Sequence, residues 1–156
     1  RLDERLYRLG TLVEPSVQGH ARRARPNDLD RMVDWYVDFV AEAGAPGRET
    51  NAGDLLRLRI AQNELVVWEN EGEIVAMAGF STPIAGMSRV GPVYTLPRHR
   101  RRGYGSAVTH AATVAAREAG AAEVVLFTDL ANPTSNGIYQ ALGYRPVSDY
   151  ATIFYT

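Results

Sequence analysis

A cluster of arginines ahead of two glycines is the part of the sequence best suited to chemistry. It leads directly into an alanine-rich helical pattern that stops at Gly120. The start of a helix offers backbone N–H groups without partners in the helix, together with the positive end of the helix dipole. Glycine also allows close approach to an anion. The pattern predicts a phosphate-binding loop, and an exposed basic turn is the alternative. The loop consists of Arg100, Arg101, Arg102, Gly103, Tyr104, Gly105 and Ser106.

Two common phosphate loops can be tested against this segment. A Walker loop requires a lysine after its second glycine, and residues 100–106 contain none. The dinucleotide fingerprint requires a third glycine three residues after Gly105, where the chain has Val108. The loop matches neither motif.

A second segment, from Asn132 to Tyr144, has an equally distinctive pattern. Asn132 is followed by a small residue, Ser135, then by Tyr139 and finally by a Leu-Gly-Tyr end. Asparagine before Pro133 predicts a helix cap, because its side chain can accept a bond from a free N–H group of the first turn.

Together the two segments resemble the GNAT superfamily of acyl-CoA-dependent N-acyltransferases. VYTLPRHRRRGYGSA is similar to that family's pyrophosphate motif, and NPTSNGIYQALGY is similar to its following motif. The resemblance is specific from Val93 to Val147 and weak before Leu65. The longer run FTDLANPTSNGIYQALGYRPV is similar to a bacterial subgroup of unassigned substrate.

The resemblance implies that acetyl-CoA is the cosubstrate, with no metal, and lies between two splayed parallel strands. Those strands match Ser88–Thr95 and Glu123–Thr128. Arg100 either braces the loop or meets a phosphate. The resemblance also implies that pantetheine binds to the backbone of Val93, Tyr94 and Thr95. It implies that the pyrophosphate binds to the N–H groups of Arg101, Arg102, Gly103, Tyr104, Gly105 and Ser106. Asn132 either bonds the pantetheine or only caps its helix, and Ser135 is a small residue that lets the cofactor approach closely.

Tyr139 matches the family's general acid, whereas the general base is not readable. Many family members carry a glutamate on the strand before the loop, and Met87–Thr95 contains no carboxylate. Glu69, Asp129 and Asp149 are candidates elsewhere, and a water chain to bulk solvent is the alternative. The missing carboxylate keeps a second hypothesis open, namely a non-catalytic acyl-CoA-binding or regulatory domain.

Composition narrows the class of protein. The 156 residues suffice for one domain, 46% are hydrophobic, and the net charge is −1. Arginines gathered in one turn of a near-neutral chain argue against nucleic-acid binding. No apolar run approaches the roughly 18 residues of a membrane span. The absence of cysteine excludes a cysteine nucleophile and fits a cytoplasmic location. We expect a monomer or homodimer that acts on an amine of a small molecule, peptide or protein.

The elements predicted around these motifs describe an α/β (α+β) fold of the GNAT type. We expect a mixed, mostly antiparallel central sheet of about six to seven strands, with a parallel splayed pair at its centre and helices on both faces. Residues 1–19 are predicted to be a linker or the remnant of an upstream lobe, and their first half is either a helix or a strand. Residues 20–156 are predicted to form the domain. The predicted helices are Asp28–Ala43, Ala52–Ala61, Gly103–Ala119 and Asn132–Leu142; the predicted strands are His20–Ala24, Glu64–Trp68, Glu73–Ser81, Ser88–Thr95, Glu123–Thr128, Tyr144–Val147 and Tyr150–Tyr155.

Overall fold

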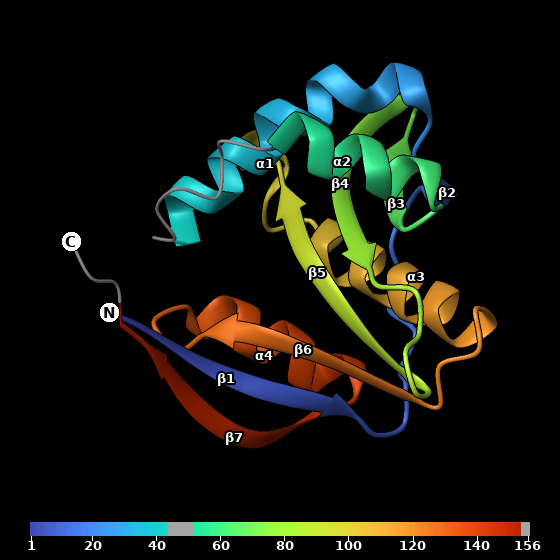
Figure 1. Cartoon of the computed structure of the whole chain (residues 1–156). Coiled ribbons are helices and arrows are strands. Elements are labelled where there is room, and N and C mark those ends of the chain that lie inside the picture. The colour runs from blue at the N-terminus through green and yellow to red at the C-terminus, as the bar shows by residue number, and fades with distance from the viewer. Residues whose placement is uncertain (44–51, 154–156) are drawn as a thin grey trace.

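Seven strands form one sheet in the order β2-β3-β4-β5-β6-β1-β7 (Figure 1). The computed structural model describes residues 1–43 and 52–153. The mixed, mostly antiparallel sheet that the sequence predicts is confirmed. The strands are β1 (Leu2–Leu9), β2 (His20–Arg23), β3 (Leu65–Asn70), β4 (Glu73–Phe80), β5 (Met87–Thr95), β6 (Glu123–Asp129) and β7 (Tyr144–Thr152); the helices are α1 (Leu29–Ala43), α2 (Ala52–Ala61), α3 (Tyr104–Glu118) and α4 (Pro133–Leu142).

The parallel pair lies at the centre of the sheet. β5 and β6 pair in parallel from Met87↔Glu123 to Val90↔Leu126, and the described ladder ends there. Beyond that point the two strands diverge toward their carboxyl ends (Figure 1). A register irregularity between β4 and β5 falls at the same level, opposite Gly79. The expected splay is therefore present and begins just after Val90.

Helices cover both faces of the sheet. α3 and α4 pack with apolar side chains such as Val66, Val108 and Leu126 in one core cluster. α1 and α2 pack on the opposite face with a second cluster that includes Met32, Leu56 and Met77. Alternation along β3 and β4 sends successive side chains into these two clusters. This arrangement is why both strands read as almost continuous apolar runs.

The first strand of the chain lies inside the sheet. β1 pairs antiparallel with β6 on one side and with β7 on the other. The sequence left helix and strand open for this segment, and the strand is observed. The sheet thus begins before residue 20, the residue at which the domain was expected to start after a linker. The buried ring of Tyr7 anchors β1 in the core.

The predicted pair of closing strands is wrong. One strand, β7, runs through Ser148 and Asp149, where a break between Tyr144–Val147 and Tyr150–Tyr155 was expected. Pairing with β1 continues across that point, with Leu6↔Ser148 and Arg5↔Asp149. Tyr155 lies outside the described residues.

Candidate active site

The predicted phosphate-binding loop has a backbone that requires glycine at Gly103. Gly103 precedes α3 with φ 84°, and a Cβ placed there would lie 3.1 Å from Cγ2 of Val17. Arg101 also has a positive φ of 67°. The first helical bond runs from Ala107 N–H to the Gly103 carbonyl. The N–H groups just before Ala107 therefore belong to the helix start, where an anion is favoured.

The second glycine has a different role. Gly105 lies within the first turn of α3, and a Cβ there would meet Thr95 Oγ1 at 3.4 Å, an ordinary contact. Its backbone conformation therefore does not demand glycine. Ser106 is half-buried in the same turn, whereas Arg101 and Arg102 are exposed. The loop combines a helix start with two solvent-facing cations.

Side chains from β3 and β4 hold the loop in place. The Glu73 carboxylate accepts bonds from Arg98 Nη2 at 2.8 Å and pairs with His99 Nε2 at 3.1 Å. These contacts, with Arg98 as the larger influence, lower the pKa of Glu73. On the other side, Asn70 Nδ2 donates to the Tyr104 hydroxyl at 2.9 Å. The segment just before the loop and Tyr104 within it are thus both attached to the β3–β4 hairpin.

Arg100 braces the loop, one of the two roles left open by the sequence. Its Nε donates to the Thr95 carbonyl at 3.1 Å, and its guanidinium carbon lies 5.5 Å from the centre of the Tyr94 ring. The contact joins the loop to the end of β5. A role in phosphate binding stays a prediction.

The predicted pantetheine-binding segment lies at the diverging end of β5. Val93, Tyr94 and Thr95 pair with β4 through Ala78, Met77 and Ala76. In the described residues, the ladder with β6 has already ended at Val90↔Leu126. The opposite edge of β5 is therefore available as a strand-like partner along this stretch.

Asn132 caps α4, as one of its two proposed roles requires. Its side-chain oxygen accepts a bond from the Ser135 N–H at 3.1 Å, and Pro133 opens the helix. The Asn136 amide also donates to the Asn132 carbonyl at 2.7 Å. Ser135 is half-buried. Contacts of Asn132 or Ser135 with a cofactor stay predictions.

Tyr139 belongs to a cluster of three tyrosines on the face of the sheet that α3 and α4 cover. Its ring makes edge-to-face contacts, with centroids 6.5 Å apart, with both Tyr7 and Tyr144. Burial, and to a smaller extent the neighbouring Tyr144, raises the pKa of Tyr139 above its ordinary value. The hydroxyl therefore keeps its proton at neutral pH and can serve as a hydrogen-bond donor.

One polar network at this helix escaped the sequence analysis. The Tyr7 hydroxyl donates to Asn136 Oδ1 at 2.6 Å and accepts from Gln140 Nε2 at 3.2 Å. These bonds connect β1 with two turns of α4. No local sequence pattern signals these bonds, because more than 120 residues separate the partners.

Comparisons with known proteins agree with this geometry. The model of the acetyltransferase (GNAT) family matches residues 29–144, most of the chain. The chain belongs to the GNAT family. No curated protein sequence is significantly similar to it.

Solved structures share the GNAT fold. An acetyltransferase from Colwellia psychrerythraea has a TM-score of 0.77 at 16% identity, over 96% of this chain and 54% of its own. A GCN5-related N-acetyltransferase from Sphaerobacter thermophilus has a TM-score of 0.78 at 17% identity, over 96% and 50%. A ribosomal-protein-alanine N-acetyltransferase from Brucella melitensis has a TM-score of 0.67 at 21% identity, over 80% and 83%. The chain spans about half the length of the first two.

Two of the candidate bases in this GNAT domain are held in ion pairs. Glu69 accepts from Arg22 Nε at 2.7 Å, at the far side of the sheet beside β2. Asp149 accepts from Arg5 Nε at 2.7 Å on β7. The bond from each arginine lowers the pKa of its carboxylate partner. A lowered pKa makes both groups poorer proton acceptors at neutral pH.

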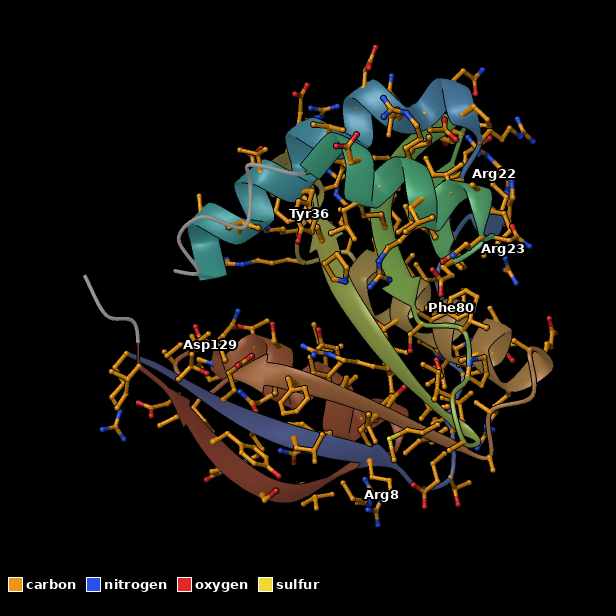
Figure 2. All side chains as sticks on the ribbon, in the orientation of Figure 1. Arg8, Arg22, Arg23, Tyr36, Phe80 and Asp129 are labelled. Carbon is orange, nitrogen blue, oxygen red and sulfur yellow. The ribbon has the colours of Figure 1, made fainter. Side chains whose placement is uncertain are left out.

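Asp129 is the third candidate and lies at the end of β6. Figure 2 shows it and Tyr36 of α1 on opposite sides of the region in which β5 and β6 diverge. Its Oδ1 accepts from the Ala131 N–H at 2.8 Å. Asp129 lies on β6, which borders the splay, whereas Glu69 lies on β3 and Asp149 on β7, which do not.

Other features of the GNAT domain lie apart from the splay. A cavity of about 290 Å³ separates α3 from β2, with Trp68, Arg23 and His110 among its lining residues. Across residues 1–43 and 52–153, no group of three or more His, Asp or Glu side chains is arranged to hold a metal ion. Within the same residues, no helix has the length and apolar character that crossing a bilayer requires.

Proposed function

We propose that the chain is an N-acetyltransferase that moves an acetyl group from acetyl-CoA to a primary amine. One observation carries the proposal: the sheet opens between β5 and β6 immediately beside the start of α3, with Gly103 in a left-handed conformation at that start. Membership of the GNAT family supports the reaction class.

The residues present fit acetyl-CoA. The free edge of β5 at Val93, Tyr94 and Thr95 can hydrogen-bond the pantetheine amides as a neighbouring strand does. The helix-start N–H groups suit the pyrophosphate, and Arg101 and Arg102 add positive charge. Acetyl-CoA supplies an activated acyl group as a thioester.

The reaction follows from the chemistry of an amine and a thioester. A primary amine with a pKa near 10.4 is mostly protonated at neutral pH, so it must first lose a proton. Its nitrogen then bonds to the carbonyl carbon, and a backbone N–H of β5 stabilises the oxyanion. Pro92 has no N–H, so it cannot be that donor. The C–S bond then breaks, and the thiolate receives a proton.

Tyr139 assists the leaving thiolate in this proposal. Because burial raises the pKa of Tyr139, full proton transfer to a thiolate of conjugate pKa about 8.5 is uphill. A hydrogen bond to the developing negative charge on sulfur does not require that transfer. Asp129 or a water chain beside it accepts the proton lost by the amine.

The acceptor class is proposed only as an amine of a small molecule, peptide or protein. The Brucella relative is named for acetylating an alanine of a ribosomal protein, which supports the peptide alternative by analogy. We propose a cytoplasmic location, because a chain without cysteine suits a reducing compartment and acetyl-CoA is needed as cosubstrate.

A non-catalytic acyl-CoA-binding domain is the second candidate function, favoured by the lack of a carboxylate on β5. Calorimetric titration with acetyl-CoA tests binding, and thiol release across a panel of amines tests turnover. Micromolar binding with amine-dependent thiol release supports the transferase. Binding without release from any amine favours the second candidate, and no binding by the folded protein refutes both.

A further inference from the structure

A cation from α2 reaches the point at which β5 and β6 separate. Arg59 Nη1 donates to the carbonyl oxygen of Gly91 at 3.2 Å, and Gly91 directly follows the last residue of β5 paired with β6. A Cβ on Gly79 would lie 2.7 Å from the same Nη1 atom. The absence of a side chain at Gly79 therefore leaves the space that the guanidinium occupies.

Most of the donors of this guanidinium are not used inside the protein. Within residues 1–43 and 52–153, no carboxylate lies within ion-pair distance of Arg59. Its Nε and Nη2 are not among the buried polar atoms that lack partners, so solvent reaches them. Arg57 on the same helix differs, because it pairs with Asp54 at 3.1 Å. A half-buried guanidinium with an open fork of donors is suited to a carboxylate.

The point at which β5 and β6 separate, at Gly91, is called the vertex here. The charges around the vertex reinforce the preference of Arg59 for a carboxylate. Arg89, two residues before Gly91, lies with its guanidinium carbon 4.6 Å from the centre of the Phe127 ring. Along β6, Glu123 and Asp129 lie three residues to either side of Leu126, and Asp129 faces Glu4 of β1 in register. Asp129 is three residues beyond the vertex, roughly 10 Å along the strand. Arg59 and Arg89 thus place two cations at the vertex, and the β6 carboxylates lie three residues away along the strand on either side.

Arg59 approaches from the face of the sheet that an acceptor would use. α3 and its anion-binding start cover one face, and α1 and α2 cover the other. With the pyrophosphate at α3, the attacking amine must approach from the side of α1 and α2. Arg59 comes from α2, so it would stand beside the incoming amine.

We propose that Arg59 recognises a carboxylate on the acceptor, and that the acceptor is an amino acid or another amine with a carboxylate a few atoms from its nitrogen. The inference rests on the proposed function and specifies its substrate class. Arg59 binds and orients the acceptor through its fork of donors, while the Gly91 carbonyl holds the guanidinium at the vertex.

Binding of a product mimic tests the inference without requiring turnover. The ¹⁵N-labelled protein with CoA is titrated with N-acetyl-L-phenylalanine and, separately, with its amide, while the Arg59 side-chain Nε–H signal is followed by NMR. We expect the acid to shift this signal and to bind at least about tenfold more tightly than the amide, as hydrogen bonds to a charged group imply. Arg59→Gln, which keeps a donor for the Gly91 carbonyl, should abolish the difference, and the control Arg57→Gln should preserve it.

Turnover provides the second arm of the experiment. Phenylalanine and phenylalaninamide are compared as acceptors by kcat/KM per unprotonated amine, with Arg59→Lys included to restore charge without the fork. A preference for the acid that falls in the order wild type, Lys, Gln supports the proposal. Equal binding of acid and amide, or a preference unchanged in Arg59→Gln, overturns it even when acetyl-CoA binds. Loss of acetyl-CoA binding in calorimetry instead refutes the proposed function, so the two failures are distinguishable.

Discussion

Replacing Gly103 with alanine separates the energetics of the predicted phosphate-binding loop from its proposed function. Gly103 has φ 84°, a left-handed conformation that costs an L-residue with a Cβ about 1–2 kcal/mol. The new Cβ would also lie 3.1 Å from Val17 Cγ2, a side-chain atom that can move by a few tenths of an ångström. The conformational cost therefore dominates.

This cost must be visible in one of two measurements. If the loop keeps its shape, the free energy of unfolding in urea falls by about 1–2 kcal/mol and acetyl-CoA affinity is retained. If the loop relaxes, stability is kept, and binding must restore the strained shape, so affinity falls about 5- to 30-fold. Intermediate behaviour divides the same total between the two quantities.

Two further variants make the test decisive. Gly137→Ala in α4 meets nothing within 4 Å and has no left-handed φ, so it should stabilise by about 0.5–1 kcal/mol. Gly103→Ala in a Val17→Ala background removes the contact and should leave the conformational part. A Gly103→Ala protein with unchanged unfolding free energy and unchanged acetyl-CoA affinity would show that the reasoning about the loop is wrong.

Three more perturbations test other parts of the structure. Tyr139→Phe should lower kcat by about 10- to 100-fold with little change in KM for acetyl-CoA, as loss of a hydrogen bond to a charged group implies; an unchanged kcat would remove Tyr139 from the mechanism. Tyr7→Phe should lower the free energy of unfolding by about 1–3 kcal/mol, because two side-chain partners on α4 lose their bond; chemical denaturation measures this, and no change would contradict the network. Burial alone would raise the pKa of Asp28, but the bonds that Asp28 accepts from Arg22 and the Arg25 N–H lower it. These bonds therefore stabilise the folded protein above the ordinary pKa of 3.8, and their contribution to the free energy of unfolding is lost as pH falls below that value. Arg22→Gln should therefore flatten the loss of stability between neutral and strongly acidic pH, and an unchanged profile would exclude the ion pair as its source.

The sequence determined the central architecture and the location of the predicted cofactor-binding motif. Local signals were sufficient there, because Gly120 and Gly143 end helices, Asn132 caps one, and apolar runs mark buried strands. The predicted helices and inner strands agree with the observed bounds to within two residues. The glycine pair before α3 was likewise recognisable from spacing alone.

Tertiary structure alone decided how the two ends of the chain share the sheet. β1 lies between β6 and β7, so the closing strand pairs with residues more than 130 positions away rather than with its own continuation. No local pattern encodes such a partner, because β pairing depends on which edge is free after the rest of the sheet has formed. The same holds for Tyr7 beneath α4.

The roles of the charged residues also depended on the fold. Glu69 and Asp149 were equal to Asp129 as candidate bases in the sequence, and ion pairs with distant arginines distinguish them. Arg59 attracted no interest in the sequence, where it is one of two arginines on a short helix. Only the space left by Gly79 on β4 and the carbonyl of Gly91 on β5 give it a place beside the proposed reaction centre. Sequence thus determined where the cofactor motif lies, and packing determined which charges face it, because charge pairing is set by distances between segments remote in the chain.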